Sequence, residues 1–274
     1  MQKVNNYKSG CFLMNILFIG DIVGNTGRNA VQQLVPQLRK EFNLSMVIAN
    51  AENCAAGAGL TNGCLKELRK CVDFFTAGDH VWDQKEFEKE INGVHDLVRP
   101  ANLSSMQPGV GMKIVRNPVA GDIAVIALQG KVFMRDSANC PFETAERLLT
   151  EIPGHVKSIF VDFHAEATSE KIAMGYFLDG KVTAVLGTHT HVQTNDFKIL
   201  PKGTAYITDA GMVGGEYSVL GRTVEEVVKK FRSGMPRRLP VAEGPARLDG
   251  CVISYDHLTG KANSITAISR IAEL

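Results

Sequence analysis

Two histidines stand one residue apart in the stretch VLGTHTHVQTND, residues 185–196, directly after an apolar run. Two other stretches, FTAGDHVWD and FVDFHAE, place Asp79, His80 and His164 in the same position relative to an apolar run. Imidazole and carboxylate groups are common ligands of first-row metal ions. These stretches therefore suggest the hypothesis that all three contribute to one metal site.

Five expected strands end in a side chain that can bind a metal ion. In α/β proteins the carboxyl ends of the strands form the crevice where ligands bind, so we expect these side chains to converge. If the segment after the last strand is extended, the two histidines at i and i+2 would point the same way. The side chains are Asp21 after NILFIG, Glu52 and Asn53 after MVIANA, Asp79 and His80 after DFFTAG, His164 after IFVDF, and His189 and His191 after AVLGT.

Each of these residues also has an ordinary structural interpretation. An Asp that follows a strand is more often a turn former or a helix N-cap, and a single His is more often a core or surface residue. The joint pattern favours a site, because four of the seven histidines stand at such strand ends. His95, His155 and His257 lack this setting, and for them we keep the structural interpretation.

The donor set contains no thiolate and suits Mn, Fe or Zn rather than Ca or a structural zinc. It is large enough for two ions about 3.5 to 4 Å apart, bridged by a carboxylate, a geometry suited to phosphoryl displacement. A hydroxide bridging the ions would attack phosphorus in line, and His80 would protonate the leaving oxygen, which contributes about 100-fold to 10,000-fold. The expected ligands are Asp21, Glu52, Asn53, Asp79, His164, His189 and His191.

Short β-rich apolar runs alternate with amphipathic helical patterns, which predicts an α/β fold. Strands outnumber helices in the second half, so we expect a mixed two-sheet core covered by helices in one domain. GDIVGNTG has glycines at 20, 24 and 27, which is neither a dinucleotide fingerprint nor a Walker loop. The ordered pattern begins at Met14, so residues 1–13 are interpreted as an N-terminal extension.

The composition restricts the partners and the compartment. Thirty basic and 29 acidic residues give a charge of +1, so neither stable nucleic-acid binding nor membrane association is expected. The six cysteines include no CxxC pair, and no apolar run reaches membrane-spanning length, which together predict a cytoplasmic protein. A homo-oligomer is compatible with this composition.

The motif order GDIVG, NAEN, GDHVWD, RPAN, DFHAE, GTHTHVQTND and TDAGMVGG resembles the bacterial YmdB-like branch of the calcineurin-like metallophosphoesterases, over residues 14–274. The resemblance implies a single domain with a four-layer α/β/β/α sandwich and a dinuclear centre. It also implies phosphodiesterase activity on 2′,3′-cyclic nucleotides. The seven expected ligands match family positions, with Glu52 as the bridge and His80 as the proton donor. The expected cofactors are two divalent or trivalent first-row ions, Fe or Mn first and Zn as an alternative.

Two positions depart from related patterns. Many metallophosphoesterases open with Asp-x-His, whereas this chain has Asp21-Ile22-Val23, as its own branch does. The family carries Gly-Asn-His where this sequence has Gly78-Asp79-His80. The added negative charge predicts tighter metal retention and a slower enzyme, unless Asp and Asn are interchangeable here.

The sequence thus predicts a cytoplasmic, metal-dependent phosphodiesterase, a phosphoric ester hydrolase acting on a small phosphodiester such as a 2′,3′-cyclic nucleotide. One alternative is the same centre acting on another phosphoester, such as a phosphomonoester or a phospholipid. A second is a low-turnover regulatory protein that binds a nucleotide through a metal-ordered surface. A third is that the polar strand ends are only caps and turns.

Overall fold

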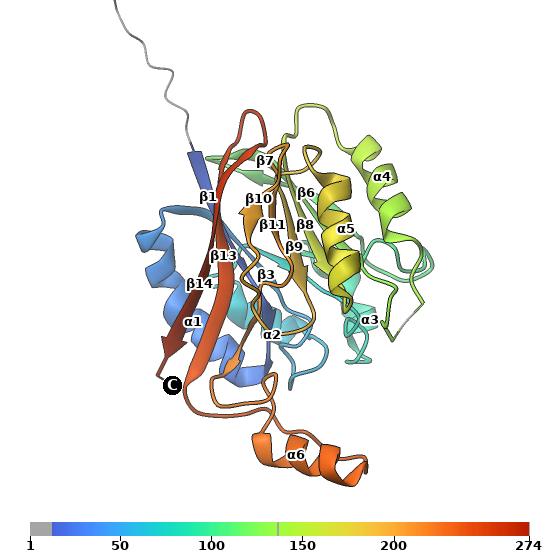
Figure 1. Cartoon of the computed structure of the whole chain (residues 1–274), viewed down its shortest axis with the longest axis vertical. Helices are drawn as coiled ribbons and strands as arrows, with labels where there is room; N and C mark the ends of the chain where they lie inside the picture. Colours follow the sequence, from blue (N-terminus) through green and yellow to red (C-terminus); the bar gives the residue numbers. More distant parts are fainter. Residues whose placement is uncertain (1–12, 136, 274) are drawn as a thin grey trace, which may run out of the picture.

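The computed structural model describes residues 13–135 and 137–273, which form two mixed β-sheets with helices on their outer sides (Figure 1). The predicted α/β class with a mixed two-sheet core is therefore confirmed. Of the predicted extension, residues 1–12 lie outside the described residues, and Leu13 is the first residue of strand β1. Within the described part of the chain, no helix has the length and apolar character needed to cross a membrane.

The first sheet has eight strands, and β1, β3, β4 and β5 run parallel to one another in it. Their carboxyl ends therefore lie at one edge of the sheet. The strands in spatial order are β2 (Asp21–Ile22), β12 (Met212–Gly215), β13 (Ala246–Asp256), β1 (Leu13–Ile19), β3 (Leu44–Asn50), β4 (Phe74–Thr76) and β5 (Leu97–Val98), and β14 (Ala262–Ala272) pairs with β13.

The second sheet has six strands, of which β7, β8, β9 and β11 are parallel. Its central strands β8 and β9 are buried throughout. The spatial order is β10 (Lys198–Ile199), β11 (Ala205–Ile207), β9 (Ala184–Thr188), β8 (Ser158–His164), β7 (Gly121–Gln129) and β6 (Met112–Asn117).

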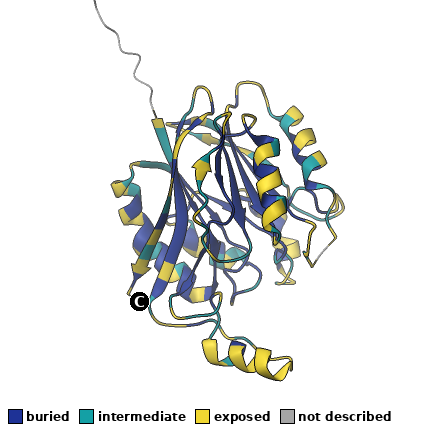
Figure 2. Cartoon of the chain, viewed as in Figure 1, coloured by how far each residue is buried: buried dark blue, intermediate teal, exposed yellow. Residues whose placement is uncertain are grey.

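The helices cover the outer faces of the two sheets, and the strands between them are largely buried (Figures 1 and 2). Helix α6 is the exception, because it projects from the body of the molecule. The helices are α1 (Gly24–Glu41), α2 (Asn62–Leu68), α3 (Phe87–Glu90), the 3₁₀ helix η1 (Ile91–Gly93), α4 (Pro141–Glu151), α5 (Thr168–Leu178) and α6 (Val224–Ser233).

Strand β1 shows how the sequence separates the two sides of the first sheet. Ile16 and Phe18 belong to the apolar cluster shared with the second sheet, whereas Leu17 and Ile19 belong to the cluster shared with α1. Successive side chains of a strand point to opposite faces, so a strand buried on both faces must be apolar throughout. The continuous apolar run ILFI, residues 16–19, is therefore the pattern of a central strand.

The glycines of GDIVGNTG have a packing role. A Cβ atom on Gly20 would lie 2.0 Å from the carbonyl oxygen of Gly211, and one on Gly27 would lie 2.3 Å from that of Val213. No larger residue fits such a close approach of two backbones. These glycines let β1 and α1 lie against β12, the strand that pairs with Asp21–Ile22.

Several elements were not predicted from the sequence. Helices α5 and α6 and the hairpin of β13 and β14 were missed. β14 has an irregular burial pattern, so it lacks the alternation that identifies a half-buried strand.

Candidate metal centre

The centre of the site is His164, the last residue of β8, whose side chain is fully buried. Its Nε2 lies 2.9 Å from Oδ1 of Asp79, 3.0 Å from Nδ1 of His189 and 3.1 Å from Oε1 of Glu52. These four residues lie at or just after the carboxyl ends of β8, β4, β9 and β3, so both sheets contribute. The convergence expected at the strand ends is present in the structure.

Three overlapping groups of side chains have ligand atoms close enough to hold a metal ion. Within each group, all of the ligand atoms lie within 4.8 Å of one another. His164, Asp79 and Glu52 each belong to two of them, and Glu52 is the residue that the resemblance assigns as the bridge. The groups are Asp79, His164 and His189; Asp21, Glu52 and His164; and Glu52, Asp79 and His80.

The other two expected ligands lie beside these groups. Oδ1 of Asn53 is 3.0 Å from Nε2 of His191, and the same nitrogen is 3.8 Å from Oδ1 of Asp21. The structure therefore brings all seven expected ligand residues into one cluster. Their role as ligands remains a prediction.

The residues present fit a metal ion. Oδ1 of Asp21 and Oε1 of Glu52 are buried and, among the described residues, neither accepts a hydrogen bond. Uncompensated buried carboxylate oxygens are costly, and bound cations are one way to satisfy them. A Cβ atom on Gly78 would lie 2.2 Å from His164 Cδ2 and 2.3 Å from Glu52 Oε2, so glycine is needed for the carboxylates and imidazoles to approach this closely.

The charges of the cluster shift the pKa values of its members. Burial acts to raise the pKa of Asp79, but hydrogen bonds from His164 and His189 outweigh it and hold the pKa well below its usual range. Burial acts to lower the pKa of His164, but the Glu52 charge and the Asp79 hydrogen bond raise it well above the ordinary value. The cluster therefore favours positive charge at its centre.

His80 lies at the edge of the cluster and lines the cleft above it. Its Nδ1 is 2.6 Å from Oδ2 of Asp83, and Arg135 donates from one nitrogen to Oδ1 of Asp83 at 3.1 Å and to the carbonyl of Asp79 at 3.0 Å. Burial acts to lower the pKa of His80, but the charges of Glu52 and Asp79 raise it. With Nδ1 engaged by Asp83, Nε2 is the nitrogen left to exchange a proton with a ligand.

The segment after β9 is bent, which corrects the expectation of an extended chain. His189 and His191 have φ values of 102° and 63°, a region that non-glycine residues rarely adopt. The bend is held by the backbone N–H of His189, which donates to Asp21 at 3.1 Å, and by that of Thr190, which donates to Asp209 at 3.0 Å. Both imidazoles reach the site through this bend rather than through strand alternation.

A buried polar network behind the histidines was missed from the sequence. Nδ1 of His164 is 2.9 Å from Oγ1 of Thr188, and this hydroxyl donates to Oδ1 of Asp162 at 2.6 Å. Such partners orient a ligating imidazole and select its tautomer. An Asp inside the buried run IFVDF was the one available signal for Asp162.

Two further supports lie nearby. Lys171, 1% exposed, donates from Nζ to Asp209 at 2.7 Å and to the carbonyl of Thr188 at 2.7 Å. Glu166, which is half-exposed, has Oε2 3.1 Å from Nε2 of His189. Neither residue stands directly after an apolar run, so the pattern used to select candidates did not include them.

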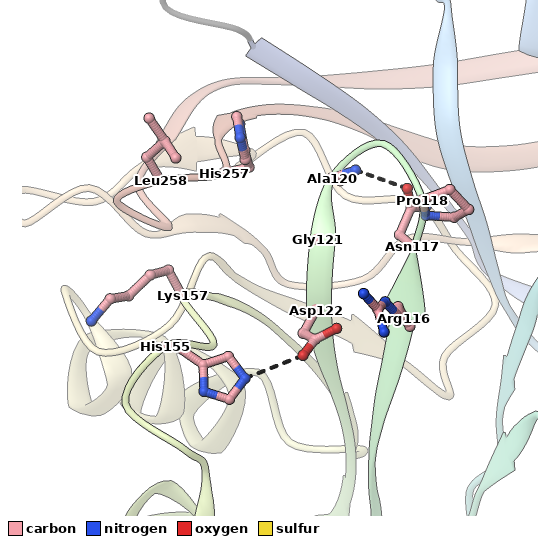
Figure 3. Close-up of a pocket in the computed structure, with 10 residues that line it drawn as sticks. All are labelled: Arg116, Asn117, Pro118, Ala120, Gly121, Asp122, His155, Lys157, His257 and Leu258. Atoms are coloured by element: carbon pink, nitrogen blue, oxygen red, sulfur yellow. Dashed lines mark hydrogen bonds and ion pairs between the residues drawn. The ribbon is translucent and has the colours of Figure 1, made fainter.

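The cluster opens into a cleft of about 380 Å³ whose rim includes Leu220 and Arg222. A larger pocket, about 800 Å³, lies at the other end of β7 and β8, between the β6–β7 turn and the β13–β14 turn (Figure 3). In it His155 contacts Asp122 at 3.2 Å, and His257 lines its far side. It contains none of the expected ligands.

The two-sheet α/β fold and the buried carboxylate–imidazole cluster together define a metal-binding class of protein. The chain belongs to the YmdB-like protein family, whose profile matches residues 17–268. It is 46% identical over 256 residues to the 2′,3′-cyclic-nucleotide 2′-phosphodiesterase of Bacillus subtilis (strain 168), covering 93% of this chain and 96% of that protein.

Two solved structures are also similar to this chain. A hypothetical protein from Thermus thermophilus superimposes with a TM-score of 0.88 at 37% identity, covering 94% of this chain and 99% of that one. A protein from Mycoplasma pneumoniae described as a novel phosphatase has a TM-score of 0.88 at 35% identity, covering 95% and 94%. The similarity therefore extends over almost the whole domain.

Proposed function

We propose that this chain is a metal-dependent phosphodiesterase that hydrolyses 2′,3′-cyclic nucleotides. The observation that carries the proposal is the cluster of Asp79, His164 and His189 with Asp21 and Glu52. Oδ1 of Asp21 and Oε1 of Glu52 are buried without a hydrogen bond among the described residues. The cluster occurs in a chain 46% identical to a 2′,3′-cyclic-nucleotide 2′-phosphodiesterase.

Two first-row ions, Fe or Mn in preference to Zn, would be held by the seven expected ligand residues, with Glu52 shared between them. Bound there, the ions would neutralise charge on the phosphate and supply Lewis acidity. The membership of Glu52, Asp79 and His164, each in two of the three groups, supports a dinuclear centre.

The protein's own side chains account for the remaining steps. Asp83 holds Nδ1 of His80, so the protonated imidazole presents Nε2–H to the departing ribose oxygen. The hydroxyl of Thr188, which donates to Asp162, holds Nδ1 of His164 and keeps Nε2 directed at the cluster. The cleft is lined by both Glu52 and His80, so a phosphodiester bound in it would be aligned with His80.

We also propose the four-layer α/β/β/α arrangement for residues 14–274, as one domain. Three separate apolar clusters support it, one between the sheets and one beneath the helices on each side. A cytoplasmic location is supported by the described cysteines, all five of which are free.

The test pairs metal analysis with turnover of 2′,3′-cAMP, with and without added Mn²⁺. We expect about two ions per chain and metal-dependent hydrolysis. His80→Asn should retain the metal and lose about 100-fold to 10,000-fold in kcat. His95→Asn, an exposed histidine distant from the cluster, is the matched control and should resemble the wild type.

The outcomes separate the alternatives. Metal without turnover on any phosphoester would favour the nucleotide-binding regulatory protein. Faster hydrolysis of a phosphomonoester would favour a phosphatase, which is how the Mycoplasma pneumoniae structure is described. A metal-free protein under every condition would eliminate the centre itself.

A further inference from the structure

Of the described residues that line the cleft above the cluster, Arg222 is the only Arg or Lys. Its side chain is half-buried, and burial lowers the pKa of the guanidinium. All of its side-chain hydrogen bonds within the described structure go to backbone carbonyls, and none goes to a carboxylate. Glu166, which also lines the cleft, is engaged with His189 instead. The cleft therefore holds a positive charge that has no anionic partner in the described part of the chain.

The guanidinium of Arg222 is fixed by three carbonyl groups on two other segments. Nη1 donates to the carbonyl of Ala56 at 3.1 Å and to that of Leu239 at 3.0 Å, and Nη2 donates to that of Gly57. Gly57 has a φ of 84°, and a Cβ atom there would lie 2.5 Å from Nη1, so glycine leaves room for this contact. The backbone is fixed as well, because Arg222 and Val219 exchange hydrogen bonds of 3.0 and 2.9 Å. The guanidinium is therefore in place before a ligand arrives.

These contacts leave one edge of the guanidinium without a partner among the described residues. Of its five N–H groups, both on Nη1 and one on Nη2 are used, so the Nε–H and the second N–H of Nη2 remain. Arg69 uses the same two nitrogens to hold Asp96 through hydrogen bonds of 2.6 and 2.7 Å. Arg247 holds Glu216 in the same way. The edge left on Arg222 is thus the one that binds two oxygens of a single anionic group.

Arg222 lies beside the cluster rather than within it. The turn that holds its guanidinium, residues 56–57, begins three residues after the expected ligand Asn53. The carbonyl of Leu220, two residues before Arg222, lies 3.4 Å from Nδ1 of the expected ligand His191. Even so, the guanidinium bonds to none of the carboxylates of the cluster. An anionic group held by its remaining edge would therefore lie next to the cluster, at a separate position.

We propose that Arg222 binds a second phosphate of the substrate, one that is not hydrolysed. This role rests on the proposed function and specifies which 2′,3′-cyclic nucleotides the cleft prefers. The 2′ and 3′ oxygens of such a nucleotide are both part of the cyclic ester, so the 5′ oxygen is the ribose position that can carry another phosphate. The preferred substrate is therefore a 2′,3′-cyclic nucleotide with a phosphate on its 5′ side. This phosphate is either a free 5′-phosphate or the diester that joins a preceding nucleotide.

Turnover of matched substrates measures the preference. The reference is 2′,3′-cAMP, which is compared with the same nucleotide carrying a 5′-phosphate and with an adenosine dinucleotide that ends in a 2′,3′-cyclic phosphate. Paired hydrogen bonds between charged groups are the strong ones, so we expect kcat/KM to be about 10-fold to 100-fold higher for at least one of the two. A preference for the first alone identifies a free 5′-phosphate as the ligand, and a preference for the second alone identifies the diester.

Substitutions of Arg222 separate contact with the second phosphate from a structural role. Arg222→Gln keeps an amide that can donate to the carbonyls but has no charge, so it should lose the preference. Arg222→Lys keeps the charge without the two-nitrogen edge and should keep part of it. Arg238→Gln is the matched control, because Arg238 is exposed and does not line the cleft, and it should keep the wild-type preference. A purely structural role would lower kcat/KM for all three substrates by the same factor.

Two results overturn the proposal: a wild type that prefers neither phosphorylated substrate, and an Arg222→Gln variant that keeps the wild-type preference. Failure of the proposed function differs from both, because none of the three substrates would then be hydrolysed. Calorimetry in the presence of Mn²⁺ decides that case by comparing adenosine 3′-phosphate with adenosine 3′,5′-bisphosphate. We expect the wild type, but not Arg222→Gln, to bind the bisphosphate about 10-fold to 100-fold more tightly. Equal affinities of the wild type for the two ligands overturn the role of Arg222.

Discussion

The two sheets contribute different donors to the cluster and hold them in different ways. The first sheet delivers the oxygen side, Asp21, Glu52, Asn53 and Asp79, and the second delivers the nitrogen side, His164, His189 and His191. Backbone hydrogen bonds between neighbouring segments support the oxygen side, together with one side-chain acceptor, Oδ1 of Asn50, at the N–H of Glu52. The N–H of Ala51 donates to Thr76 and that of Gly24 donates to Asn53, both at 2.9 Å.

The nitrogen side depends instead on buried polar side chains. Thr188 and Asp162 orient His164, and the Lys171–Asp209 pair holds the bend that carries His189. A strand end positions a residue that follows it directly, whereas a strained bend needs other groups to hold it. Conservative side-chain substitutions should therefore damage the nitrogen side more than the oxygen side.

The largest effect should come from Lys171→Met. Removing one partner of a buried ion pair leaves the other charge uncompensated, so we expect about 3 kcal/mol lower stability to unfolding. Urea denaturation measures it. Lys229→Met, which removes an exposed pair on α6, is the control and should leave the midpoint nearly unchanged. Equal effects of the two would mean that the nitrogen side does not depend on its buried pair.

Thr188→Val should weaken metal binding by about 10-fold to 100-fold, because His164 loses the partner of its Nδ1. Chelator competition measures the affinity. Thr76→Val is a matched control, since Thr76 is equally buried and also donates to Asp162 but contacts no expected ligand. It should keep metal affinity within a few-fold of the wild type. If both variants lose affinity equally, the contrast between the two sides is wrong.

Asp79→Asn alters the oxygen side by one charge. The carboxylate lies 2.9 Å from His164 Nε2, so its loss should weaken metal retention and reduce repulsion of the phosphate. Under saturating Mn²⁺ we expect kcat to rise by about tenfold, which corresponds to about 1.4 kcal/mol. Asp122→Asn, at the opposite end of the sheets, serves as the control. Equal turnover of Asp79→Asn and wild type would show that Asp and Asn are interchangeable at this position.

The smallest effect should come from Glu166→Gln. Its contact with His189 is half-exposed, so solvent screens the pair and metal affinity should fall by only a few-fold. Calorimetric titration with Mn²⁺ resolves a change of this size. A loss as large as that of Thr188→Val would make Glu166 a member of the buried support rather than a peripheral residue.

The sequence by itself determined the fold class and the members of the cluster. The run ILFI indicates a central strand because every position in it is apolar. Such strands end at or just before the positions of Asp21, Glu52, Asn53, Asp79 and His164. These patterns are local, since apolar periodicity and the residue after a strand can both be read within a few positions.

Only the tertiary structure decided how the nitrogen side is held and which surfaces remain exposed. The bend at His189 and His191 depends on two hydrogen bonds with residues distant in the sequence. Asp21 is 168 residues away from its donor His189, and Asp209 is 19 residues away from its donor Thr190. On α6, the exposure of Val228 and Phe231 depends on where Val227 attaches to the body, which helical spacing cannot specify. Amphipathic spacing shows that a helix has an apolar side, but packing with distant segments decides whether that side faces the core or the solvent.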